Sequence, residues 1–283
     1  MHPRNPLHFG EILVCLDGSS YSQAAVEYAT QIALEHTASL TGIGVIDLPG
    51  LQRTSGPAPI GAMHYDRLAD QQHFQETRET VTGVLKNFGN TCQEKGIHHS
   101  IHSEMGSPFR EIIEESKFHD FIVIGQKTFF RYNVRHEPGN TLDRILHNGL
   151  TAVLAVPDSV RPIKKVLVAY DGSVQVTKAI QMFLLLHIWN QCDVTLLNVN
   201  NNASRGIQLL GRLGDYFRRY GVQTEKVQLR GRVDETILSY IREHEIDLLV
   251  MGAYGKRSVS EFVFGSVTKS LVAQAGIPLF IYH

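Results

Sequence analysis

The sequence predicts an α/β protein made of two doubly wound, five-stranded parallel sheets in tandem. The first observation is an internal repeat, because EILVCLDGS at 11–19 matches KVLVAYDGS at 165–173. The second is a matching pair near the end of each copy, DFIVIG at 120–125 and DLLVMG at 247–252. The third is that short apolar runs alternate with helix-compatible segments in both copies, which favours parallel strands joined by helices.

The expected elements of the first copy follow from hydrophobic periodicity and turn residues. Helix 20–37, for example, carries an apolar stripe that includes Ala24, Tyr28 and Ile32. The expected strands are 12–16, 39–46, 98–104, 121–124 and 152–156. The expected helices are 20–37, 74–95, 109–117 and 141–148.

The second copy repeats this order after a polar linker bracketed by Pro157 and Pro162. The predicted domains are therefore 1–157 and 162–283. The expected strands are 166–169, 193–199, 223–229, 248–251 and 279–282, and the expected helices are 174–190, 204–220, 233–244 and 266–274. The closing strands 153–156 and 279–282 are the obvious edges for pairing, either between the two domains or in a homodimer.

The first copy also contains an insertion. Asp17 and Gly125 are 108 residues apart, whereas Asp171 and Gly252 are 81 residues apart. The surplus falls at 47–73, in a stretch that contains several glycines and prolines. Long loops of this kind are usually lids, contact surfaces or disordered segments, and we expect a contact or covering role.

A spaced set of glycines in the second copy predicts an anion site. Gly252 follows an apolar strand, Gly255 comes three residues later, and Gly265-Ser266 opens the last helix. Glycine allows close approach of the backbone to a ligand, and the first N–H groups of a helix attract anions. The hydroxyls of Ser266 and Thr268 can donate to the same phosphate. The alternative is an ordinary strand–helix connection that needs glycine at positive φ.

This motif, together with the opening Asp-Gly-Ser, resembles the ATP-binding signature of the universal stress protein family, whose fold is Rossmann-like. The resemblance implies that the second domain binds ATP, with Mg²⁺ as an optional companion. Asp171 would lie by the ribose and adenine, although it also suits a simple turn. Lys256 and Arg257 would neutralise phosphate charge unless they are merely solvated. The full set of implied binding residues is Ala169, Tyr170, Asp171, Val199, Met251, Gly252, Gly255, Lys256, Arg257, Gly265, Ser266, Val267 and Thr268.

The first copy departs from this signature. Thr128 replaces the second glycine, the loop that follows contains bulky residues, and Asn140 replaces the serine. A β-branched residue is strained at positive φ, and the aromatic residues can fill the phosphate space. We therefore expect no ATP there in the manner of the family, although Asp17 and Thr141 leave room for a different ligand.

Charge and composition exclude several classes of protein. The formal net charge of −1 offers no basic field for nucleic acid or anionic membranes. No apolar run reaches the roughly 18 residues of a transmembrane helix, and the first residues lack a signal core, so we expect a cytoplasmic protein. The scattered cysteines and histidines do not predict a metal site.

Three functions fit these patterns. The favoured one is a stress-response protein that binds an adenine nucleotide as a regulatory ligand, without a catalytic residue. The second is a slow ATPase, although Ser258, Ser260 and Glu261 have no partner that the sequence can show. The third is a structural pseudo-dimer that uses no nucleotide.

Overall fold

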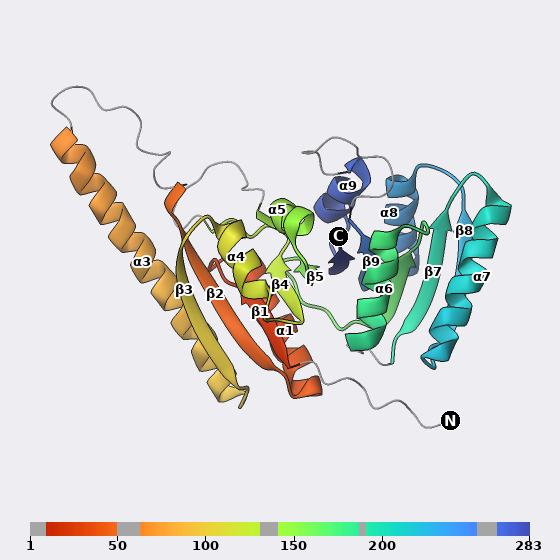
Figure 1. Cartoon of the computed structure of the whole chain (residues 1–283), viewed down its shortest axis with the longest axis horizontal. Helices are drawn as coiled ribbons and strands as arrows, with labels where there is room; N and C mark the ends of the chain where they lie inside the picture. The colour runs from red at the N-terminus through yellow and green to blue at the C-terminus, as the bar shows by residue number, and fades with distance from the viewer. Residues whose placement is uncertain (1–9, 50–62, 131–140, 187–190, 254–264) are drawn as a thin grey trace.

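A computed structural model describes residues 10–49, 63–130, 141–186, 191–253 and 265–283, with only the backbone described at 63–70. Ten strands form one sheet in the order β3-β2-β1-β4-β5-β10-β9-β6-β7-β8. Figure 1 shows the two halves of the chain side by side, each with its own set of helices. The predicted α/β class and the two doubly wound five-stranded halves are confirmed, and the halves join into a continuous sheet.

The first half contains five parallel strands. These are β1 (Glu11–Cys15), β2 (Ser39–Asp47), β3 (His99–Gly106), β4 (Phe121–Gly125) and β5 (Ala152–Val156). Its helices are α1 (Ser20–His36), α3 (Met63–Glu94), α4 (Pro108–Ser116) and α5 (Thr141–Asn148). Strands β1, β4 and β5 are buried on both faces, which explains why they read as continuous apolar runs.

The second half repeats the arrangement with five parallel strands of its own. The strands are β6 (Lys165–Ala169), β7 (Asp193–Val199), β8 (Thr224–Leu229), β9 (Leu248–Gly252) and β10 (Leu279–Tyr282). The helices are α6 (Val174–Leu186), α7 (Ala203–Arg219), α8 (Val233–His244) and α9 (Ser266–Gln274). Asn202 caps α7, because its side chain accepts the N–H of Arg205.

The core lies in two layers, one on each face of the sheet. Helices α1, α3, α6 and α7 pack on one face, and their apolar residues share a cluster with Phe88, Phe217 and Phe280. Helices α4, α5, α8 and α9 pack on the other face, around Ile124, Phe130 and other residues. Each half therefore places two helices on either side of its strands, as the doubly wound pattern requires.

The halves meet where β5 pairs antiparallel with β10. Leu279 lies opposite Ala155, and Ile281 lies opposite Val153. These are the closing strands whose edges the sequence predicts to pair. Tyr28 strengthens the junction, since its hydroxyl lies 3.1 Å from the N–H of Arg161 in the linker and 3.3 Å from its carbonyl.

Helix α3 corrects the expected extent of the insertion. It begins at Met63, so residues 63–73, expected within the insertion, are helical. The sequence contains no glycine or proline from 62 to 82, and nothing therefore interrupts a helix there. The helix runs along β2 and β3 (Figure 1). The expected covering role of the insertion falls mainly on 50–62, outside the described residues.

The packing of α3 on β2 generates a stability prediction. A Cβ at Gly42 would lie 2.6 Å from ring atoms of the buried Phe88, so Gly42→Ala should destabilise the protein by about 1–3 kcal/mol. Gly83 is the control, because its Cβ would meet nothing within 4 Å and alanine favours a helix by about 1 kcal/mol. Urea unfolding should show opposite shifts, and equal midpoints would contradict the packing at Gly42.

Candidate functional site

The carboxyl ends of β6 and β9 lie side by side where the strand order of the second half reverses. Strand β6 pairs with β9 on one side and with β7 on the other. Helix α6 leaves β6 to pack on one face of the sheet, and α9 follows β9 on the opposite face. Parallel sheets bind ligands in the crevice at such a point. The described residues of the predicted site lie at or next to these strand ends and at the start of α9.

Gly252 holds the start of α6 against the end of β9. An added Cβ would lie 2.5 Å from the backbone nitrogen of Val176, which leaves no room for a side chain. Gly125 makes a similar contact in the first half, where an added Cβ would lie 2.5 Å from the Cβ of Tyr21. The backbone of Gly252 does not have a positive φ, and Gly265 has φ of −53°. A need for positive φ therefore does not explain these two glycines.

Asp171 forms the turn between β6 and α6. Its Oδ1 accepts the N–H of Ser173 at 2.8 Å, and Gly172 between them has φ of 80°. The side chain is exposed, and no other hydrogen-bond partner of it occurs in the described part of the chain. Asp171 is therefore a turn residue, and its Oδ2 accepts no hydrogen bond from the described residues.

The strand ends beside Asp171 supply apolar walls. Ala169, Val199 and Met251 contribute to the cluster beneath α8 and α9, whereas Tyr170 packs with the cluster on the other face. The backbone carbonyl of Tyr170 accepts the side-chain amide of Asn198 at 2.6 Å. The sequence interpretation missed Asn198, although a lone polar residue in the apolar strand DVTLLNV is the signal that could have revealed it.

The amino end of α9 has no side-chain cap among the described residues. Gly265 occupies the N-cap position, where it makes no side-chain hydrogen bond, and the first turn has no acidic residue. Ser266 is exposed and Thr268 is buried. The helix ladder begins with the bond from the Lys269 N–H to the Gly265 carbonyl. The N–H groups of the first turn precede that bond, so they are oriented to bind an anion.

In the first half, the residues that follow β4 bond to the corresponding aspartate. Asp17 Oδ1 accepts from the backbone N–H and the hydroxyl of Ser19, at 3.0 and 2.6 Å. Its Oδ2 accepts the backbone N–H of Phe129 at 2.8 Å. The next side chain, Phe130, is only 1% exposed and packs in the core. The carboxylate of Asp17 is thus satisfied by the polypeptide itself.

The strained residue in this loop is Phe130, which has φ of 52°. Thr128 does not have a positive φ, so the steric penalty expected at this residue does not arise. Thr128 is instead buried, with its N–H donating to the carbonyl of Gly125 at 3.2 Å. The loop therefore accommodates the lost glycine by turning inward.

Comparison with known proteins identifies the family. Residues 8–157 and 204–283 match the model of the universal stress protein family, which is more than half of the chain. The chain belongs to this family. No helix among the described residues is long and apolar enough to cross a membrane.

Similar universal stress proteins have one domain or two. Slr1230 of Synechocystis sp. is 25% identical over 284 residues, covering 96% of this chain and 99% of that protein. YxiE of Bacillus subtilis is 24% identical over 143 residues, covering 41% of this chain and 97% of that protein. The crystal structure of a universal stress protein from Archaeoglobus fulgidus has a TM-score of 0.71 and 19% identity, with coverage of 96% and 97%. The structural likeness confirms the fold.

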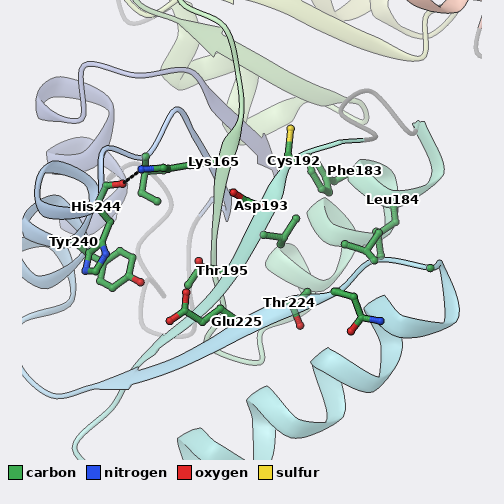
Figure 2. A pocket seen from close by; sticks show the side chains of 15 residues that line it. Lys165, Phe183, Leu184, Cys192, Asp193, Thr195, Thr224, Glu225, Tyr240 and His244 are labelled. Carbon is green, nitrogen blue, oxygen red and sulfur yellow. Dashed lines mark hydrogen bonds between the residues drawn. The ribbon is translucent and has the colours of Figure 1, made fainter.

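This universal stress protein also has a cavity of about 610 Å³ at the opposite end of the sheet, near the starts of β6, β7 and β8. Figure 2 shows Thr195 and Glu225 close together on adjacent strands, and Lys165 bonded to the backbone carbonyl of His244. Tyr240 stacks on the ring of His244, with 3.9 Å between centroids. The cavity is lined by residues from both faces of the sheet and is separate from the predicted nucleotide site.

Cys192 at the edge of this cavity has no features of a reactive thiol. Burial, and then the carboxylates of Asp247, Asp193 and Glu35, raise the pKa of Cys192 to about 11. The thiol lies 3.3 Å from the carbonyl of Ile163, to which it donates. It therefore stays protonated at neutral pH, and nucleophilic chemistry is not indicated here.

Among the predicted binding residues, Gly255, Lys256 and Arg257 lie outside the described residues. Those that are described come together at the ends of β6, β7 and β9 and at the start of α9. The residues that sequence analysis missed are Asn198 and Gln126. The position of Gln126 corresponds to that of Ala253 in the second half, and this exchange of a long polar side chain for a methyl was the available signal.

Because Asp17 and Asp171 have different surroundings, replacing each by alanine should reduce the stability of the fold by different amounts. Asp17→Ala should destabilise the protein by about 1–3 kcal/mol, because the N–H of Phe129 loses its partner in a partly buried place. Asp171→Ala should cost well below about 1 kcal/mol, since its side chain is exposed and holds one N–H. Thermal unfolding of the two variants without nucleotide measures both effects. A larger loss for Asp171→Ala would show that the two turns were misinterpreted.

Proposed function

We propose that the second half of this universal stress protein binds ATP or a closely related adenine nucleotide as a regulatory ligand. The amino end of α9, which has Gly265 at the N-cap position and no acidic residue in its first turn, carries this proposal. Helices α1 and α6 differ, because the hydroxyls of Ser19 and Ser173 accept N–H groups of their first turns, those of Ser22 and Val176. A helix end without its own acceptor favours a negatively charged ligand.

Each described residue of the site suits a part of the nucleotide. The carboxylate of Asp171 can accept the ribose hydroxyls, while Ala169, Val199 and Met251 offer apolar surface to the base. Ser266, Val267 and Thr268 present N–H groups, and the serine adds an exposed hydroxyl for the phosphates. Gly255, Lys256 and Arg257 stay predictions from the sequence for the same phosphates, and Mg²⁺ would enter with the nucleotide rather than through a separate protein site.

The described contacts of the first half argue against a nucleotide bound there in the same way. In the first half, the N–H of Phe129 occupies Oδ2 of Asp17, and Phe130 is buried in the core. A ribose would have to displace that N–H and reopen the loop. In the second half, Oδ1 of the exposed Asp171 accepts the N–H of Ser173, and the residue that corresponds to Phe129 lies outside the described residues.

A regulatory ligand fits the site better than a substrate does. Asp171, the described carboxylate at the crevice, is held by a backbone N–H and not by a second side chain, as a general base would be. Occupancy would instead stabilise the folded state of the second half and its contacts. A cytoplasmic location, and a stress-dependent partner, stay predictions.

Ser266→Asp tests the proposal directly. A carboxylate in the first turn of α9 should raise the stability of the free protein by about 0.3–1 kcal/mol through the helix dipole. The same charge should repel the phosphates and weaken ATP binding by about 100-fold or more, because like charges placed together at a binding site cost several kcal/mol. Isothermal titration calorimetry with ATP–Mg²⁺ measures the affinity, and thermal unfolding measures the stability.

Ser20→Asp is the matched control, because Ser20 is exposed at the first position of α1 in the other half. It should leave the ATP affinity unchanged. Unchanged binding by Ser266→Asp, or no binding by the unmodified protein, would exclude the proposed site. Release of phosphate above background would favour an enzyme instead.

A further inference from the structure

Gln126 forms a hydrogen-bonded link between the two halves. Its side-chain nitrogen lies 2.7 Å from the carbonyl oxygen of Ile277 and 3.3 Å from that of Ala155. Both partners are acceptors, so the amide orientation is fixed and both of its hydrogens are used. The pairing of β5 with β10 ends at Ala155 and Leu279. Gln126 therefore adds a further contact just beyond the last strand pair.

The first half holds Gln126 firmly in place. Its backbone N–H donates to the carbonyl of Val156 at 2.8 Å, directly after β4. The loop that follows is fixed by the bond from the Phe129 N–H to Asp17 and by the burial of Phe130. The side chain thus projects from the loop that follows β4 in the first half.

Ile277 lies on the short connection between α9 and β10. It is 2% exposed and packs in the same core cluster as Leu271 of α9. Gly276 before it has φ of 62°, and its carbonyl also lies 3.5 Å from a guanidinium nitrogen of Arg161. Two side chains from outside the second half therefore contact the turn that ends α9.

The opposite side of the junction has a different contact. Ala253 corresponds to Gln126, since its N–H donates to the carbonyl of Tyr282 at 2.8 Å, but its methyl group cannot bridge the halves. The hydroxyl of Tyr282 instead donates to the carbonyl of Leu150, in the turn between α5 and β5 of the first half. Each half thus touches the turn after the last helix of the other half, through unlike side chains.

We infer that Gln126 is a positioning residue for the nucleotide site of the second half, an inference that rests on the proposed function. Helix α9 connects the N–H groups of Ser266 to Thr268 at its amino end with the turn at Ile277 beyond its carboxyl end. Fixing the turn fixes the distance of those N–H groups from the phosphates, and anion binding depends steeply on that distance. The loop that follows β4 in the first half thereby sets the affinity of the site in the second half.

The experiment compares three variants of the full-length protein. Gln126→Ala removes the contact, Gln126→Met keeps the length of the side chain without the amide, and Tyr282→Phe removes the contact on the opposite side. Both Gln126 variants should bind ATP–Mg²⁺ about three- to tenfold more weakly in calorimetry. Tyr282→Phe should bind as the unmodified protein does, while losing a comparable amount of thermal stability.

Hydrogen exchange without nucleotide gives an independent result. The amides of α9 and of residues 275–277 should exchange several-fold faster in both Gln126 variants than in Tyr282→Phe. Equal ATP affinity and equal exchange in all variants would overturn the inference while leaving the proposed function intact. An equal loss of affinity in Tyr282→Phe would show that only the general strength of the junction matters, which also overturns it. If the unmodified protein binds no ATP, the proposed function fails first and the inference fails with it.

Discussion

The antiparallel pairing of β5 with β10 is the constraint on which the rest of the structure depends. Both strands are apolar and almost fully buried, so either half alone would expose a row of unpaired backbone groups beside apolar surface. Pairing satisfies those groups and joins ten strands into one sheet. It also brings the carboxyl edge of the first half beside the last helix of the second. The contact between Gln126 and Ile277 exists only because of this arrangement.

The repeat has diverged without losing its packing. Gly125 and Gly252 each allow the start of a helix to pack closely against a strand end, and both halves of the fold require this close packing. Asp17 and Asp171 both form turns with the serine two residues later. The loops after β4 and β9 differ in sequence, and in the first half the N–H of Phe129 bonds to Asp17 while Phe130 is buried in the core. The glycine contacts and the turns are thus kept in both halves, whereas the sequence of this loop has changed.

Much of this architecture could be predicted because local and long-range signals agree. Helix α8 runs from Val233 to His244 and α9 from Ser266 to Gln274, as the apolar spacing indicates. The predicted start of α3 at residue 74 was wrong, since the helix begins at Met63. The glycines and prolines before Met63 led to the interpretation of the whole stretch 47–73 as an insertion without a helix. The side chain of Gln126 was unpredictable for another reason. Its acceptor is 151 residues away in sequence, and only the strand pairing brings the two together.

The ends of the continuous sheet have a consequence for assembly. Because β5 and β10 are used within the chain, the outer edges are β3 and β8. Strand β8 carries the exposed charges of Glu225 and Lys226, and His102 of β3 lies 3.2 Å from a carboxylate oxygen of Glu115 in α4. Charged residues on an edge strand discourage a further strand from adding to it. Addition of a strand from another copy at the β8 edge is thereby disfavoured.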